Sequence, residues 1–180
     1  MKPFLVLFAL LGQTTVFDLS PARTSVEFMV DSTLHTVHGT FTLKHGTLRV
    51  DPATGSVAGE LVVDANSGAS GSEGRDRRMA REILESPKYP EIVFRPDRME
   101  GTLSAQGKSQ VKLHGAFSIH GAQHEVTAPV EAQAVAGGYD ATAHFEIPYV
   151  EWGMKNPSTF ILRVNKTVTV TVHTVVRTGE

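Results

Sequence analysis

The chain has 180 residues, a formal net charge of −2, 41% hydrophobic residues and no cysteine. This length allows one domain with a sizeable core, and the composition is that of an ordinary soluble globular protein. The slight negative charge argues against a nucleic-acid surface, and the lack of cysteine excludes disulfides, a thiolate nucleophile and iron–sulfur clusters.

Residues 1–15 have the order of a secretory signal peptide. Lys2 precedes the apolar run 4–11, and smaller, more polar residues follow at 12–15. The run is far shorter than the roughly 20 residues that span a bilayer, so we expect a cleaved leader and not a membrane span. We therefore predict an exported protein, periplasmic or secreted, whose domain covers residues 16–180. The alternative interpretation is that the run is a buried first strand.

Period-2 alternation of apolar residues dominates the rest of the chain. Val26, Phe28 and Val30 share one face of an expected strand, and residues 168–172 alternate in the same way. Short turns rich in glycine, proline and aspartate separate roughly eight to ten such strands, with no alternation of strands and helices. Because an open sheet of this size would leave unpaired edges, we expect an all-β, antiparallel fold closed into a barrel or strongly curved.

One short amphipathic helix is expected at residues 74–85. Met79 and Ile83 lie four residues apart and form a narrow apolar stripe, with Leu84 beside them. A single helix with one apolar stripe must lay that stripe on the sheet. We therefore expect the helix to cover an opening of the barrel.

The boundaries of this helix follow from its flanking residues. Ser72 or Asp76 is a candidate cap at the start, and Pro87 prevents continuation at the end. A strand is expected at 57–64, and the small polar residues 66–71 are expected to form the loop that leads into the helix.

Phenylalanines occupy inward positions of the expected strands. An eight-stranded barrel has an interior that is either packed solid or holds one slender ligand. A filled core is the ordinary interpretation of such an aromatic set, and a ligand cavity is the other. The residues concerned are Phe28, Phe41, Phe94, Phe117 and Phe145.

The cluster Arg75-Asp76-Arg77-Arg78 also has two interpretations. It is either a solvated helix start, with Asp76 at the positive end of the helix dipole, or an anion-attracting collar beside a pocket mouth. In the second case Arg75 and Arg77 are the candidates for contact with a lipid head group.

The sequence contains no motif for catalysis or metal binding. It has no Gly-x-Ser-x-Gly elbow, and no histidine is spaced to activate a serine. His35 and His38 should point to opposite faces of a strand, while His120 and His124 flank a hairpin without a third ligand. We therefore expect a non-enzymatic protein without metal or cofactor.

Four sequence blocks resemble the YceI-like family of polyisoprenoid-binding proteins. Each block is short, but their order and spacing together cover nearly all of residues 16–180. They are FDLSPARTSVEF at 17–28 with GTF at 39–41, GRD at 74–76 with YPEIVF at 89–94, GAFSIHG at 115–121, and FEIPYVEWGM at 145–154.

The resemblance implies an eight-stranded, lipocalin-like antiparallel barrel with an elongated apolar tunnel. It implies a non-catalytic carrier of a long-chain isoprenoid or fatty amphiphile, acting as a monomer or homodimer. The alternative is a filled barrel that serves as a structural or stress-associated interaction domain and binds no lipid. The tunnel-lining residues expected on this basis are Phe28, Phe41, Met79, Ile83, Phe94, Phe117, Ile119 and Phe145.

Overall fold

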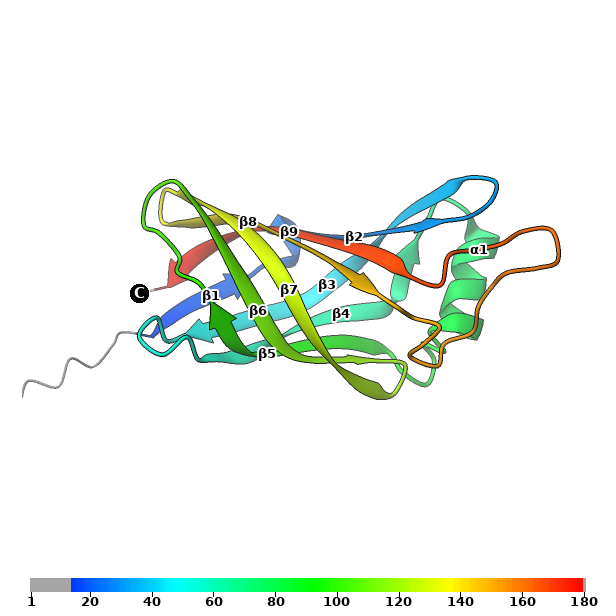
Figure 1. Cartoon of the computed structure of the whole chain (residues 1–180), viewed down its shortest axis with the longest axis horizontal. Coiled ribbons are helices and arrows are strands. Elements are labelled where there is room, and N and C mark those ends of the chain that lie inside the picture. The colour runs from blue at the N-terminus through cyan, green and yellow to red at the C-terminus, as the bar shows by residue number, and fades with distance from the viewer. Residues whose placement is uncertain (1–13, 180) are drawn as a thin grey trace, which may run out of the picture.

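A computed structural model describes residues 14–179, which form an antiparallel sheet closed into a barrel (Figure 1). The expected leader at 1–15 lies outside the described residues except for its last two positions, so it stays a prediction. Within 14–179, no helix has the length and apolar character needed to cross a bilayer.

The elements follow one another along the chain with short connections. They are β1 (Thr15–Leu19), the 3₁₀ turn η1 (Pro21–Arg23), β2 (Thr24–Asp31), β3 (Thr36–Val50), β4 (Val57–Ala69), α1 (Glu73–Arg78), the π-helical turn η2 (Met79–Ile83), β5 (Glu91–Glu100), β6 (Lys108–Ile119), β7 (Ala122–Val135), β8 (Gly138–Ile147) and β9 (Val168–Gly179).

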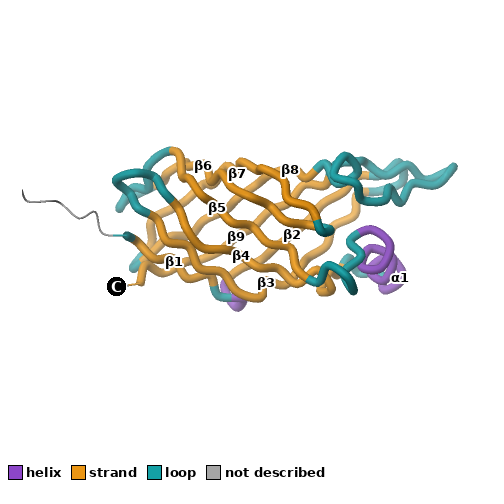
Figure 2. The backbone as a smooth tube through the Cα atoms, turned by 90° about the horizontal axis from the view of Figure 1, so that it is seen from below, coloured by secondary structure: helices purple, strands orange, loops and turns teal. Residues whose placement is uncertain are grey.

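From β3 to β9 each strand pairs with the next one along the chain, always antiparallel. The strands β1 and β2 are interrupted by η1 and share one position, because both pair with β3 on one side and β9 on the other. The nine strands therefore make an eight-stranded, up-and-down barrel (Figure 2). The prediction of a closed antiparallel barrel is confirmed.

The two ends of the barrel carry different elements, as both views show (Figures 1 and 2). At one end, named the helix end here, lie α1, the β2–β3 hairpin and the long segment 148–167. The turns β3–β4, β5–β6 and β7–β8 and the start of β1 lie at the other end, named the far end. A cluster of buried apolar residues packs near each of them.

The strand β4 is longer than expected. Residues 66–69 were predicted as loop, but they continue β4, and Ala69 pairs with Thr40 of β3. Tertiary contacts override the turn tendency of these small residues. The Thr42 amide donates to Ser67 Oγ at 2.8 Å, and Gly68 lies so close to Phe41 and Met79 that a Cβ there would force their side chains to shift. Small residues are needed here because the helix packs directly over the strand.

The expected helix at 74–85 forms, but its second half is a π-helical turn. The Leu84 amide donates to the Met79 carbonyl at 2.9 Å, five residues back, in place of the α-helical bond. The helix ends before Pro87, since Glu85 has a φ of 47°. Ser72 occupies the N-cap position without a side-chain cap bond.

Ser86 fixes the end of this helix to the barrel. It is fully buried, and its hydroxyl donates to Asn66 Oδ1 at 2.7 Å and lies 3.1 Å from the Ala80 carbonyl. The Ala80 carbonyl also accepts from the Ser86 amide at 2.8 Å. A buried hydroxyl that donates such a hydrogen bond is stabilising, and its removal breaks the bond to Asn66, whose own side chain is exposed.

We expect Ser86→Ala to lower the free energy of unfolding by about 0.5–1.5 kcal/mol, the net contribution of a typical hydrogen bond. Ser72→Ala is the matched control, because its hydroxyl makes no cap bond, and it should stay within about 0.5 kcal/mol of the parent chain. Urea unfolding measures both. Equal effects of the two substitutions would contradict this account of the helix.

Candidate functional site

An apolar cavity of about 300 Å³ runs inside the barrel. It is lined by residues of both core clusters, from Phe17 and Val176 near the far end to Met79 and Tyr149 at the helix end. Its volume is roughly twenty times the ~15 Å³ that holds one water molecule. The barrel is therefore not packed solid, which weighs against the filled-core interpretation.

The structure places all eight expected tunnel residues around this cavity. They come from five strands and from the helix, and the alternation of the strands turns the strand side chains inward. They are Phe28, Phe41, Met79, Ile83, Phe94, Phe117, Ile119 and Phe145. Whether they contact a lipid stays a prediction.

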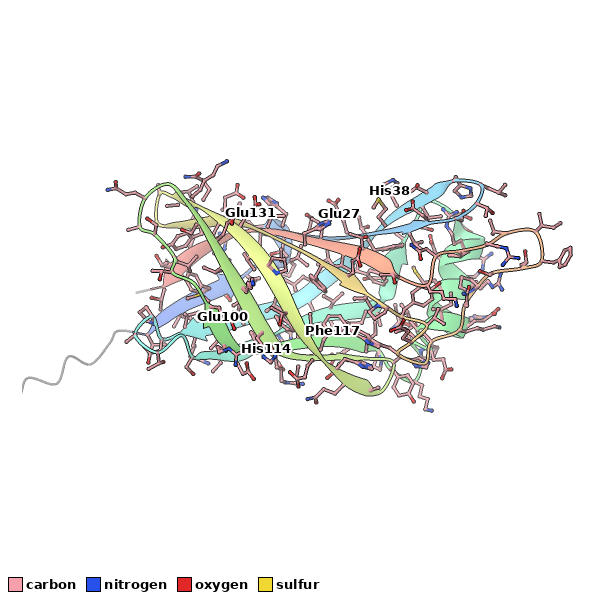
Figure 3. The ribbon with its side chains drawn as sticks, viewed as in Figure 1. Glu27, His38, Glu100, His114, Phe117 and Glu131 are labelled. Carbon is pink, nitrogen blue, oxygen red and sulfur yellow. The ribbon has the colours of Figure 1, made fainter. Side chains whose placement is uncertain are left out.

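Phe117 is the centre of an aromatic group at the helix end of the cavity. Its ring centroid lies 6.4 Å from Phe94, 6.1 Å from Phe145 and 5.9 Å from Trp152. Edge-on and tilted contacts at this spacing stabilise aromatic clusters. The polar residues labelled with Phe117 in Figure 3 (Glu27, His38, Glu100 and Glu131) are exposed, whereas Phe117 is buried.

Sequence reasoning missed the small residues that leave the cavity empty. In β8 the inward positions are Tyr139, Ala141, Ala143, Phe145 and Ile147, and the two alanines line the cavity. Period-2 alternation predicts the inward position of Ala141 and Ala143 as clearly as that of Phe145. An inward alanine, however, does not stand out in a sequence as a residue that lines a cavity. Tyr149 and Met154 line the cavity from an irregular segment that carries no such pattern.

The cavity wall offers almost no polar chemistry. Thr174 lines it, but the Thr174 and Thr24 hydroxyl oxygens are 2.8 Å apart and satisfy each other. The Tyr149 hydroxyl donates to the Asn165 carbonyl at 2.7 Å, and burial raises the pKa of this phenol, so it is neutral at neutral pH. Glu27 borders the cavity but its side chain is exposed. The site can bind an apolar chain without leaving polar groups unpaired.

The segment 148–167 is attached to the helix by an exposed ion pair. Lys155 Nζ donates to Glu82 Oε2 at 2.8 Å, and this hydrogen bond, with the charges of Lys155 and Arg78, lowers the pKa of Glu82. A carboxylate with a lowered pKa stabilises the fold above that pKa, and this contribution is lost only as the pH falls through the pKa. At neutral pH the ion pair between Glu82 and Lys155 is therefore intact. Exposed pairs contribute little energy, so it orients the segment more than it stabilises the fold.

Arg75 and Arg77 do not line the cavity. The Arg75 guanidinium donates to the Ser70 hydroxyl and carbonyl, both at 2.7 Å, and thereby fixes the start of the helix to the end of β4. Arg77 lies 3.3 Å from Glu73 on the exposed face. Their role as head-group contacts stays a prediction that this placement does not favour.

The barrel wall has a seam between β7 and β8. Their pairing stops at Val130 and Ala143, so residues 122–129 of β7 pair only with β6 and residues 144–147 of β8 only with β9. Pro129, which has no amide hydrogen, stands where the pairing stops. A shallow cleft follows the seam, and Phe145 lines both this cleft and the cavity.

The histidines do not assemble into a metal site. His120 lies 3.3 Å from Glu85, while His124 stacks on Trp152 with ring centroids 4.0 Å apart. The part of the chain that the structure describes contains no group of three or more histidine or acidic side chains placed to hold a metal. The Nε2 atom of His124 is buried without a hydrogen-bond partner among those residues.

Solved structures similar to this chain include the following three. The chain superposes on BcnA of Burkholderia cenocepacia with a TM-score of 0.71 at 17% identity, covering 88% of this chain and 99% of that one. It also superposes on a polyisoprenoid binding domain from Saccharophagus degradans implicated in plant cell wall breakdown, with a TM-score of 0.66 at 14% identity, covering 93% of this chain and 100% of that one. With a YceI protein of Campylobacter jejuni the TM-score is 0.60 at 15% identity, and the match covers 75% of this chain and 80% of that one. No curated protein sequence matches the chain.

The fold and the cavity define a closed, up-and-down β-barrel with an enclosed apolar interior. Residues 17–176 match the YceI-like domain. The chain therefore belongs to the YceI-like family, as its sequence blocks indicated.

The cavity predicts that the interior accepts added volume where it is empty. Ala143→Phe should change the free energy of unfolding by less than about 1 kcal/mol, because its ring enters the cavity. Ala128→Phe is the control, since Ala128 is 3% exposed and is not part of the cavity lining. Overpacking there should cost about 1–3 kcal/mol or more. Chemical denaturation compares the two, and a full overpacking cost at Ala143 would show that the interior is filled.

Proposed function

We propose that the protein is a non-catalytic carrier that holds the chain of a long isoprenoid, or of a similar amphiphilic lipid, inside the barrel. The observation that carries this proposal is the cavity itself, which extends from one core cluster to the other and is lined almost wholly by apolar side chains. Transfer of such a chain from water to this lining is favourable by roughly 25 cal/mol per Å² of buried apolar area.

The chemistry of the lining favours a hydrocarbon chain over other ligands. A sugar, nucleotide or peptide would bury hydrogen-bonding groups that find no partners in this wall, at a cost of several kcal/mol. A polyprenyl chain has no polar atoms except at its terminus. The similarity to a domain described as polyisoprenoid binding supports the same ligand class.

The arrangement of titratable groups supports binding rather than catalysis. The cavity wall places no carboxylate beside a histidine or a hydroxyl nucleophile, since Glu27 points outward and the Thr174 hydroxyl is paired with Thr24. General acid–base chemistry needs such groups within hydrogen-bond reach of the reacting atom. The interior offers shape and apolar surface instead.

The polar terminus of the lipid would lie at the helix end. The buried Nε2 of His124, beside Trp152, has no hydrogen-bond partner among the described residues, whereas Phe17, Val50 and Val57 pack together in the core cluster near the far end. This orientation leaves a head group near water while the chain extends toward the far end.

Titration of delipidated protein with a fluorescent prenyl alcohol tests the proposed function. The parent chain should bind the probe, and Ala143→Phe should weaken binding by about tenfold or more, because the added ring occupies space that the probe needs. Thr142→Phe, the neighbouring position outside the cavity lining, is the control and should bind like the parent. A parent chain that binds no probe, and that carries no lipid mass in native mass spectrometry, would sink the carrier proposal.

We also propose that the protein is exported. The support is the leader-like order of residues 1–15 together with the start of β1 at Thr15, where the folded barrel begins. Sequencing the N-terminus of protein from its native host should give a chain that starts near Thr15 or Val16. Recovery of Met1-Lys2-Pro3 from the cytoplasmic fraction would contradict export.

A further inference from the structure

Exposed apolar side chains are concentrated at the helix end. Among the described residues, the large hydrophobic side chains in open solvent are Leu34 (69% exposed), Phe160 (101%), Ile161 (81%) and Val135 (42%). The three most exposed of these all belong to the helix end, on the β2–β3 hairpin and on segment 148–167. Single exposed apolar residues are ordinary, but three at one end of a molecule mark an interaction surface.

Leu34, Phe160 and Ile161, named the apolar tip here, are held on one backbone unit. The hairpin and the segment bond to each other: the Thr33 amide donates to the Arg163 carbonyl at 2.9 Å, and the Asn165 amide donates to the Asp31 carbonyl at 2.8 Å. A bridge between Ser32 and Val164 extends the same ladder. The apolar tip is therefore presented by two strand-like segments paired with each other, and not by two independent loops.

The part of the tip that belongs to segment 148–167 also projects beyond the rest of the described molecule (Figure 1). Segment 148–167 extends past α1 in two perpendicular views (Figures 1 and 2), so a flat surface can meet the tip before it meets the helix. The same segment supplies Met154, Pro157 and Val164 to the cavity wall. The tip and the end of the cavity are thus parts of one structural unit.

Charge around the tip distinguishes the partner that it fits. Segment 148–167 carries three cations, Lys155, Arg163 and Lys166, and one acidic residue, Glu151. Residues 32–38 of the hairpin carry no acidic residue and Asp31 stands at its base, whereas the chain as a whole has a net charge of −2. Lys155 is paired with Glu82, but no ion pair of Arg163 or Lys166 is found among residues 14–179. Apolar side chains flanked by cations match the interface of an anionic bilayer, where the rings enter the acyl boundary and the cations meet the head groups.

A second copy of the chain fits this surface less well. In a two-fold symmetric contact the same patch lies on both subunits, so Arg163 and Lys166 of the two copies would be brought into one interface. Like charges brought together at an interface weaken it. The cations therefore favour an anionic lipid surface over self-association.

We propose that the apolar tip docks the helix end of the protein on anionic lipid bilayers. Docking needs no ligand in the cavity. Its use, to bring the end of the cavity against the bilayer for lipid exchange, rests on the proposed carrier function. Leu34, Phe160 and Ile161 insert, while Arg163 and Lys166 contact phosphate groups.

A site-specific label tests the orientation directly. Because the chain has no cysteine, Ile161→Cys and Val135→Cys each accept a single environment-sensitive fluorophore, the first at the tip and the second near the far end. On mixing with vesicles of phosphatidylcholine and phosphatidylglycerol, the label at 161 should shift to the blue and brighten by about twofold or more, as expected on entering the interface. The label at 135 should not change.

Vesicle sedimentation of the full chain then assigns the contributions. Phe160→Ser combined with Ile161→Ser should weaken binding by about tenfold or more, and Val135→Ser should not. Arg163→Gln with Lys166→Gln should weaken binding on the order of tenfold at low ionic strength, and added salt should remove this difference. Lys108→Gln with Lys112→Gln, two exposed lysines of β6, is the matched control.

Three results would overturn the proposal. In the first, the label at 161 is unchanged while the protein still binds vesicles through the apolar run 4–11, which every variant shares. In the second, the chain does not bind anionic vesicles at all. In the third, sedimentation velocity shows a dimer that Phe160→Ser abolishes, which means that the apolar tip binds a second copy of the chain. Binding of the prenyl probe in the absence of vesicles is measured for each variant as well. If probe binding persists while vesicle docking fails, only the docking proposal is contradicted. If vesicle docking persists while the probe does not bind, only the carrier proposal is contradicted.

Discussion

The pairing of β9 with β2 closes the barrel, and the interior cavity exists because of it. It joins segments about 150 residues apart, from Thr24 opposite Thr174 to Met29 opposite Thr169, and a buried contact between the hydroxyls of Thr24 and Thr174 lies at one end of it. Closure removes the exposed edges that an antiparallel sheet of this size would otherwise present to other chains. It also forces every second side chain of every strand into the same confined space.

That space is left partly empty by the choice of inward residues. Large rings at Phe94, Phe117 and Phe145 crowd the helix end, but Ala141 and Ala143 on β8 face the interior with only a methyl group each. An interior of this strand number is just wide enough to be filled by side chains. Small residues on one strand therefore suffice to turn a core into a cavity, without any change in the backbone.

Much of this architecture was predictable from the sequence. Alternation of apolar residues marks the inward phenylalanines and the closed antiparallel sheet, because strand geometry has a fixed period of two. The spacing of Met79 and Ile83 marks the helix face that lies over the cavity, as the structure shows. These features depend on local chemistry, which a sequence displays directly.

Other features depend on contacts that the sequence does not display. The extension of β4 through Ala69 results from the approach of Met79 and Phe41 to Gly68, and a run of small polar residues gives no sign of it. Arg75 is a candidate head-group contact, and in the structure its guanidinium donates to Ser70, just beyond the end of β4. The cavity itself depends on how side chains from opposite walls of the barrel meet. The alternation of apolar residues does not decide whether those side chains fill the interior or leave it hollow.

The seam between β7 and β8 gives the barrel a compliant side. Where neighbouring strands pair, the wall can widen only by breaking backbone hydrogen bonds, but beyond Val130 and Ala143 these two strands have no mutual pairing to break. Outward bending of residues 144–147 with Phe145 would enlarge the interior at the cost of side-chain packing alone. The volume of the interior can therefore change along this seam while the paired strands of the barrel keep their register.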